Sequence, residues 1–119
     1  MALYIVWTDR QNAKIFKLGA NSEELELHWK QPDHKTRGPD AEEHESEKFY
    51  HSIAAELRDA KGILIVGPGV GRTHFKHHLD KHDPKLAAMV LGVESADHPT
   101  DGQLKALARK FFNNPLHAV

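Results

Sequence analysis

Apolar and polar residues alternate in three short segments at the beginning of the chain. Residues 3–8 form a short β-type run, and residues 13–18 alternate apolar with basic side chains, as strands do. Residues 25–29 alternate in the same way. A polar stretch with two prolines and one glycine follows at residues 31–40, where the alternation stops. These patterns predict three strands in a meander and then a long exposed loop.

Helical spacing follows the loop. A helix is expected to begin at Asp40, because acidic side chains favour the first turn of a helix. Its apolar face is predicted to comprise Phe49, Ile53, Ala54, Leu57 and Ala60. Residues 62–66 are continuously apolar, which is typical of a strand that is buried on both faces. This strand runs into the glycine-rich sequence Gly67-Pro68-Gly69-Val70-Gly71.

The next segment predicts a second helix and another strand. Thr73 is expected to cap this helix, Phe75 and Leu79 to face the core, and Pro84 to end the element. Residues 89–93 are apolar and predict a second buried strand. Because strands joined through a helix in one sheet are connected by a right-handed crossover, we expect these two buried strands to be parallel.

A capping box marks the last predicted helix. Thr100 and Gln103 have the spacing of this motif and precede an apolar stripe at helical spacing. The stripe consists of Leu104, Leu107, Ala108 and Phe111. The predicted element order is therefore β-β-β-α-β-α-β-α. We expect one α/β domain over residues 1–119, in which helices cover both faces of a mixed five-stranded sheet, an RNase H-like three-layer sandwich.

Composition narrows the functional classes. The chain has 119 residues and no cysteine, which excludes thiol nucleophiles, disulfides and zinc–thiolate sites. Its net charge is only −1, so affinity for nucleic acid would need a local basic patch. No apolar run approaches the ~20 residues of a membrane span, and the first run is too short for a signal sequence. We expect a cytoplasmic protein without membrane contact. Ten histidines are the unusual feature.

Three features, taken in order, resemble one family. They are the sequence YIVWTDRQNAKIF at residues 4–16, the long loop after the third strand, and ILIVGPG at residues 63–69, which runs into Thr73-His74-Phe75-Lys76. Together they resemble the middle domain of archaeal and eukaryotic class-1 release factors and of the ribosome-rescue protein Pelota. They are especially similar to small bacterial, release-factor-like translational machinery proteins that carry such a domain. The resemblance covers residues 3–112 and implies an RNase H-like fold.

The long loop departs from the family pattern. In release factors this loop carries a Gly-Gly-Gln tripeptide, which helps water to attack the ester of peptidyl-tRNA. The corresponding stretch at 33–40 retains Gly38 without a following glutamine, and Pro39 removes a backbone N–H. The resemblance therefore implies a non-catalytic, ribosome- or RNA-associated domain without a cofactor. A role under stress or during ribosome inactivity suits such a domain.

Basic residues gather in two places that the resemblance makes candidates for RNA contact. One is the loop at 34–37. The other is residues 72–85, with four Lys or Arg, four histidines and two acids, whereas residues 40–59 carry seven acids against two basic residues. Lys and Arg bind nucleic acid by neutralising phosphates. The predicted contacts to ribosome or structured RNA are His34, Lys35, Arg37, Arg72, His74, Lys76, His77 and Lys81. Solvated loop and helix surfaces are the alternative.

The glycine-rich junction allows another function. Free N–H groups at a helix N-terminus attract anions, and an arginine beside them helps to hold a phosphate. A small-anion or nucleotide site would consist of Gly67, Gly69, Gly71 and Arg72. The alternative is that these glycines only shape the turn. A homodimeric interaction module, formed through an exposed sheet edge, is a third candidate function.

Two metal-dependent functions are weaker candidates. His74, His78 and His82 are spaced i, i+4, i+8, which suits incidental chelation, but a biological site usually adds a carboxylate and supporting partners. A two-metal nuclease needs several converging carboxylates. Asp9 near the end of the first strand could be one, but the fourth strand ends in Gly67-Pro68, where a second acid would be needed. We therefore predict neither a metal site nor catalytic residues.

Overall fold

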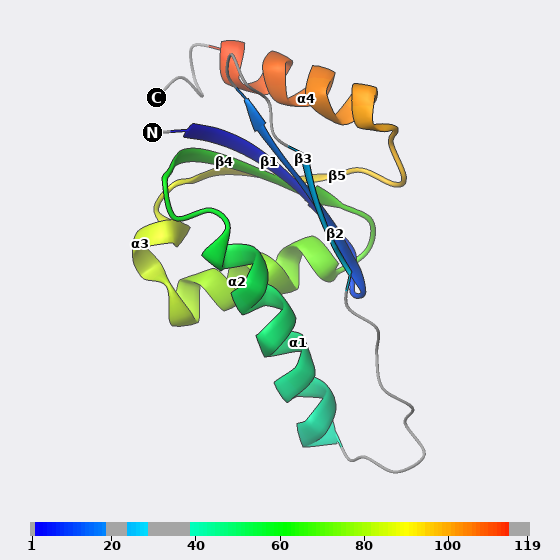
Figure 1. The fold of residues 1–119 in the computed structure, drawn as a ribbon, viewed down its shortest axis with the longest axis vertical. Coiled ribbons are helices and arrows are strands. Elements are labelled where there is room, and N and C mark those ends of the chain that lie inside the picture. The colour runs from blue at the N-terminus through cyan, green and yellow to red at the C-terminus, as the bar shows by residue number, and fades with distance from the viewer. Residues whose placement is uncertain (1, 19–23, 29–38, 115–119) are drawn as a thin grey trace.

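The computed structural model describes residues 2–18, 24–28 and 39–114 and contains one five-stranded sheet between two helical layers (Figure 1). The elements are β1 (Ala2–Thr8), β2 (Asn12–Leu18), β3 (Glu24–His28), α1 (Pro39–Ala55), β4 (Ala60–Gly67), α2 (Gly71–His82), α3 (Pro84–Ala87), β5 (Val90–Ser95) and α4 (Asp101–Asn113). Among these ranges, none of the helices has the length and apolar character to cross a membrane.

The sheet has the strand order β3-β2-β1-β4-β5. β1 pairs antiparallel with β2, and β2 pairs antiparallel with β3, so the first three strands form the expected meander. β4 is parallel to both β1 and β5. The mixed α/β class and the parallel arrangement of the two later strands are thus confirmed. β3 and β5 are the two edge strands of this sheet.

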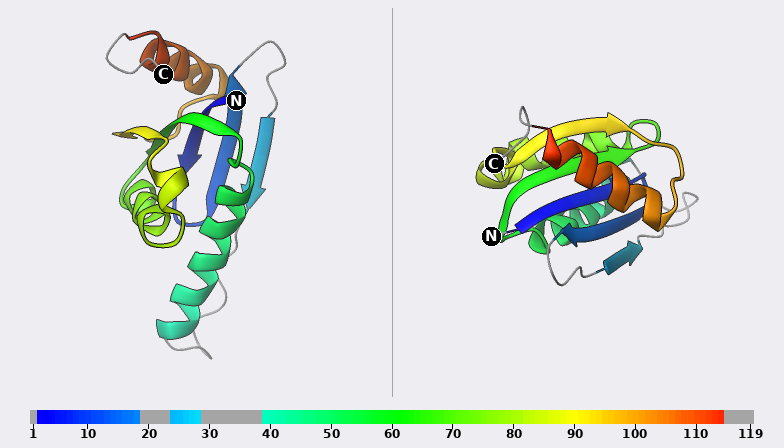
Figure 2. Two further views of the ribbon diagram at one scale, coloured as in Figure 1. Left: turned by 90° about the vertical axis from the view of Figure 1, so that its left-hand side faces the viewer. Right: turned by 90° about the horizontal axis from the view of Figure 1, so that it is seen from above.

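Each face of the sheet has its own apolar core, because the strand side chains alternate between faces. The helices α1, α2 and α3 lie on one face of the sheet and α4 lies on the other (Figure 2). In β4, Ile63 and Ile65 belong to the core beneath α1–α3, whereas Leu64 and Val66 belong to the core beneath α4. All four side chains are fully buried. The continuous apolar run therefore marks a strand covered on both faces, as its sequence predicts.

The first helix ends earlier than its apolar pattern predicts. α1 stops at Ala55, and Leu57 and Ala60 lie beyond it, although Leu57 is fully buried. The chain after α1 forms tight turns in which each N–H bonds to the carbonyl three residues earlier, as from Leu57 to Ala54 and from Ala60 to Leu57. Leu57 reaches the core from this turn, and Ala60 begins β4. Tertiary burial therefore extends the apparent helical periodicity past the helix.

Two further predictions need correction. α2 begins at Gly71 with Val70 as its N-cap residue, so Thr73 lies inside the helix and does not cap it. β5 is an edge strand rather than a buried one, and Val93 is 37% exposed. Val90 packs on the core beneath α1–α3 and Leu91 on the core beneath α4, but both are only partly buried, because in the described sheet β5 has a neighbouring strand on one edge alone. α2 ends at His82, and Pro84 begins a short helix, α3, which is capped by the Asp83 side chain.

Candidate nucleic-acid interface

The junction between β4 and α2 is packed against the β1–β2 turn. A Cβ atom on Gly67 would lie 2.0 Å from the Thr8 carbonyl oxygen, and one on Gly71 would lie 2.7 Å from the Asp9 carbonyl carbon. Only a glycine allows such a close approach of two backbones. Gly69 differs, because its surroundings are open and its φ of 57° is the left-handed conformation that favours glycine. These residues therefore set the direction in which α2 leaves the sheet.

The β1–β2 turn is held by its own side chains. The Asp9 carboxylate accepts hydrogen bonds from the backbone N–H groups of Gln11 (2.8 Å) and Asn12 (2.6 Å). The Thr8 hydroxyl lies within hydrogen-bond distance of the Asp9 and Asn12 carbonyl oxygens. Asp9, the carboxylate considered for a nuclease site, is thus engaged in forming the turn on which α2 packs.

Arg72 folds back on the glycine-rich junction. Its Nη1 donates to the carbonyl oxygens of Gly67 (2.9 Å) and Gly69 (2.7 Å). The guanidinium group therefore bridges two carbonyls of the loop before α2, and the Arg72 side chain remains partly exposed. Val70, which precedes the helix, offers no side-chain cap, and the first turn contains no acid.

The outer surface of α2 carries the basic residues expected there. His74, His77 and Lys81 are exposed and share one side of the helix, because they are spaced i, i+3 and i+7. None of the three is paired with a carboxylate among the described residues. Lys76 is half-buried and forms an ion pair with Asp80, one turn later on the same helix. The structure thus brings three unpaired, potentially cationic groups together and engages Arg72 and Lys76 locally.

The inner surface of α2 buries a histidine. His78 is 8% exposed and lies beside the rings of Tyr50 (5.7 Å between centroids) and His82 (4.7 Å). Burial and the neighbouring His82 lower the pKa of His78, whereas Glu47 and Asp83 act in the opposite direction. Burial also raises the pKa of Tyr50. The uncharged form of His78 is therefore favoured in the folded protein.

The three histidines of the i, i+4, i+8 pattern have different surroundings. His74 is exposed, His78 is buried, and the Nε2 of His82 lies 3.7 Å from the Glu47 carboxylate on α1. Within the part of the chain that the structure describes, no cluster of three or more metal-ligating side chains is present. The loop residues His34, Lys35, Thr36 and Arg37 lie outside the described residues.

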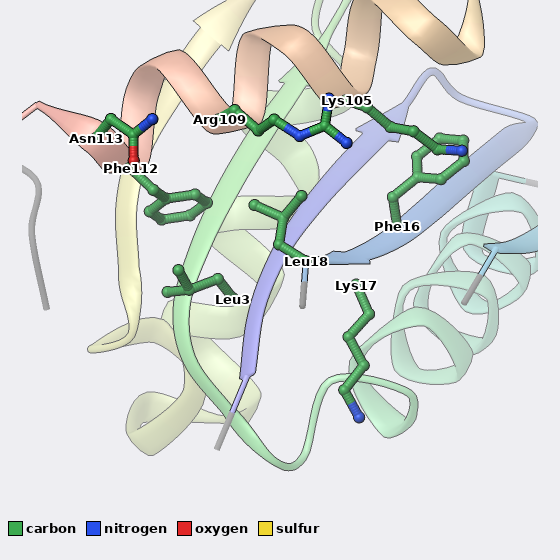
Figure 3. Close-up of a pocket in the computed structure, with 8 residues that line it drawn as sticks. All are labelled: Leu3, Phe16, Lys17, Leu18, Lys105, Arg109, Phe112 and Asn113. Carbon is green, nitrogen blue, oxygen red and sulfur yellow. The ribbon is translucent and has the colours of Figure 1, made fainter. Parts of the chain in front are cut away.

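A basic groove on the opposite face of the sheet was not predicted from the sequence. It lies between α4 and the strands β1 and β2 and has a volume of about 240 Å³ (Figure 3). Lys105 and Arg109 of α4 stand at this groove, one helical turn apart. The i, i+4 spacing of two cations beside the buried stripe of α4 was the available signal.

Solved structures of Pelota and of archaeal and yeast translation termination-like factors contain a similar fold. No family model matches the chain, and no curated protein matches it. Pelota from Archaeoglobus fulgidus is 17% identical, with a TM-score of 0.69 over 97% of this chain and 32% of that one. The archaeal termination factor aRF1 is 23% identical, with a TM-score of 0.64 over 88% of this chain and 32% of that one. The chain thus spans about a third of either protein.

A third similar structure comes from yeast. Dom34 of S. cerevisiae, a translation termination-like factor involved in RNA quality control pathways and interacting with Hbs1, is 14% identical. Its TM-score is 0.54, over 97% of this chain and 33% of Dom34. At these identities the similarity concerns the fold. At that level, the resemblance to class-1 release factors and Pelota is confirmed.

Proposed function

We propose that this chain is a non-catalytic domain of the translation apparatus that binds ribosomal RNA or tRNA, with the outer surface of α2 as its contact. The observation that carries the proposal is the exposed set His74, His77 and Lys81, which has no carboxylate partner in the described structure. It occurs on a fold shared with proteins of translation termination.

The charge and exposure of these side chains suit contact with a phosphate backbone. Phosphate contacts are made mostly by Lys, Arg and hydrogen-bond donors, and they position a protein on RNA without reading its sequence. Lys81 supplies a positive charge, and the exposed rings of His74 and His77 supply further hydrogen-bond donors for phosphate oxygens. In the same proposal His34, Lys35 and Arg37 form a second contact, Arg72 and Lys76 flank the first, and the protein acts under stress or during ribosome inactivity.

The test is co-sedimentation with ribosomes and separated subunits at low and at high salt. The wild-type chain should pellet with ribosomes at low salt and dissociate at high salt, because its contacts are electrostatic. Lys81→Glu should weaken binding and lower the salt dependence by roughly one phosphate contact or more. Lys110→Glu makes the same charge reversal at an exposed position of α4 and is the matched control.

Two results would count against the proposal. If the wild-type chain stays in the supernatant at both salt concentrations, it does not bind ribosomes and the proposal is wrong. If Lys81→Glu and Lys110→Glu weaken binding equally, the contact is not on α2. Arg37→Ala, tested alongside, measures the contribution of the 34–37 loop.

A second candidate function is anion binding at the N-terminus of α2 by Gly67, Gly69, Gly71 and Arg72. It is favoured by the lack of a side-chain cap at Val70, which leaves backbone donors of the first turn for another acceptor. Phosphate or a nucleotide should then raise the melting temperature of the protein. An unchanged melting temperature at high phosphate and nucleotide concentrations would remove this candidate.

The RNase H-like classification and homodimerisation also belong to the proposal. The order β3-β2-β1-β4-β5, with an antiparallel meander and helices on both faces, supports an RNase H-like sandwich.

The edge of β5 that has no neighbouring strand in the described sheet supports pairing with a second copy, since unpaired edge strands are templates for association. Light scattering after size exclusion would measure the mass in solution.

A further inference from the structure

The face of the sheet opposite α2 contains a groove with an apolar floor and a cationic rim. Its floor is formed by Leu3 and Leu18 from the strands, together with Phe112 from α4. Both leucines are partly exposed and pack on the core beneath α4. In Figure 3, Leu3, Leu18 and Phe112 converge below α4, with Arg109 above them. An aliphatic side chain from a partner would find only apolar contacts on this floor.

Two cations of α4 stand over the groove without an acidic partner in the described residues. The Nζ atom of Lys105 lies 5.2 Å from the centre of the Phe16 ring, a cation–π contact that fixes its position at the rim. Arg109 is exposed and follows one turn later. A guanidinium group without a partner can take a carboxylate through two parallel hydrogen bonds.

Other lysines nearby are neutralised within the chain. Lys14 pairs with Asp101 at 3.0 Å, and Lys17 pairs with Asp59 at 3.2 Å. Although Lys17 borders the groove, its side chain extends away from α4 (Figure 3). The Asp59 carboxylate also accepts a hydrogen bond from the Tyr4 hydroxyl. The charge that remains available at the groove is therefore that of Lys105 and Arg109.

The size and walls of the groove favour a peptide over a nucleotide or RNA. Its volume of about 240 Å³ is smaller than the usual pockets for cofactors and drug-sized ligands, but it is sufficient for an anchoring side chain. Proteins that bind single-stranded RNA combine a cationic groove with exposed aromatic rings on which the bases stack. Here Phe16 is only 1% and Phe112 only 9% exposed, so neither offers a ring face to a base.

We infer that this groove binds an acidic segment of a partner protein, which inserts one large apolar side chain between α4 and β1–β2 and pairs its carboxylates with Lys105 and Arg109. Anchoring aromatic or aliphatic side chains flanked by ion pairs are a common mode of peptide recognition. This site lies on the other side of the sheet from the proposed RNA contact. It does not depend on that proposal.

Fluorescence anisotropy with synthetic peptides tests the inference on the full chain. The probe is a short fluorescein-labelled peptide of glutamate and serine with one central phenylalanine. It should bind weakly, and replacement of its phenylalanine by alanine should reduce affinity about tenfold, because the apolar side chain is then no longer buried. A peptide with lysine in place of each glutamate should not bind.

Charge-reversal variants locate the site. Arg109→Glu should weaken binding of the phenylalanine peptide about fivefold or more, because an attractive contact becomes repulsive. Lys110→Glu changes the same net charge at the next, exposed position of α4, outside the groove, and should have little effect. Circular dichroism of each variant checks that it is folded.

Three outcomes would overturn the inference. The phenylalanine and alanine peptides would bind equally if the apolar floor were not used. Arg109→Glu and Lys110→Glu would weaken binding equally if the attraction were only to the net charge of α4. The third outcome is that an RNA oligonucleotide binds without displacing the peptide and that Arg109→Glu weakens this RNA binding. This face would then be a nucleic-acid surface. Loss of peptide binding leaves ribosome co-sedimentation unaffected, so the two proposals fail separately.

Discussion

The helices α2 and α4 lie on opposite faces of one sheet but are positioned by different means. α4 carries its own signals: the Thr100 hydroxyl accepts from the Gln103 N–H, and the Gln103 side chain accepts from the Thr100 N–H. α2 has neither a side-chain cap nor an acid in its first turn. Its beginning is set by Gly67 and Gly71, which bring the helix against the backbone of the β1–β2 turn.

This difference shows how a fold can release a helix surface for function. Because tertiary contact sets the beginning of α2, its first turns need not contain the residues that stabilise an isolated helix. His74, His77 and Lys81 can then occupy its outer side. Both helices bury an apolar stripe, but α4 also has a capping box, and the surface that we propose for peptide binding is limited to the cations beside the groove. Variants that separate local from tertiary positioning test this comparison.

The largest expected effect is on stability and compares Gly67, beside the β1–β2 turn, with Gly92, beneath α4. Gly67→Ala should lower the free energy of unfolding by about 3 kcal/mol, because its Cβ would meet the backbone of Thr8, which cannot move alone. Gly92→Ala, under α4, should cost about 1 kcal/mol, because its Cβ would meet the Phe111 ring, which can shift. Urea unfolding followed by circular dichroism measures both. Equal costs would show that the β1–β2 turn yields as readily as a side chain.

One substitution made in both helices gives the next effect. Thr100→Ala removes the capping hydrogen bond of α4 and should cost about 1 kcal/mol of unfolding free energy. Thr73→Ala changes an exposed residue inside α2 and should alter stability by less than about 0.5 kcal/mol. Thermal and urea unfolding of the two variants provide the measurement. A loss of similar size for Thr73→Ala would restore Thr73 as the cap of α2.

The same contrast explains what could be predicted from the sequence. The Thr100–Gln103 box and the stripe with Leu104 and Phe111 are local signals, and α4 begins and packs as they predict. The cap of α2 is Val70, three residues before the predicted cap Thr73, because the determinant of the helix start is a backbone contact with Asp9. Leu57 was assigned to a helix because its burial, from a turn, imitates helical spacing.

The candidate sites show the same limit. The histidine and lysine positions of α2 can be counted along the sequence, and the i, i+4 spacing of Lys76 and Asp80 is typical of an ion pair on a helix. Only the structure shows that Arg72 bonds to carbonyls of its own loop. The groove on α4 depends on β1 and β2, which are distant in sequence, and so Arg109 gave no interpretable signal by itself.

The third prediction uses the histidine buried under α2. Because the pKa of His78 is lowered in the folded state, the unfolded chain binds more protons as the pH falls below about 6.5. Stability should therefore decrease on acidification through that pH and recover as the pH rises. His78→Gln should flatten this dependence, and His77→Gln, an exposed control on the same helix, should retain it. The melting temperature at about pH 7.5 and about pH 5.5 measures the effect.

The surroundings of His78 determine how the result is interpreted. Glu47 and Asp83 favour its charged form, whereas burial, His82 and His51 oppose it. If His78→Gln retained the full pH dependence, another group would be responsible for it. No matching effect is expected at α4, whose buried residues, such as Leu104 and Phe111, do not titrate.

The smallest effect distinguishes an ion pair between elements from one within a helix. Lys14 joins β2 to Asp101 at the beginning of α4, whereas Lys76 and Asp80 belong to α2. Double-mutant cycles should give a coupling of about 0.5 kcal/mol for Lys14–Asp101 and about 0.3 kcal/mol for Lys76–Asp80, both reduced by salt. Lys14→Met with Asp101→Asn, and Lys76→Met with Asp80→Asn, supply the cycles.

The cycle is needed because Asp101 also interacts with the dipole of α4. Its single substitution therefore lowers stability by more than the coupling energy of the ion pair. A larger coupling within α2 would mean that local contacts stabilise that helix more than its neighbours do, which would contradict the comparison.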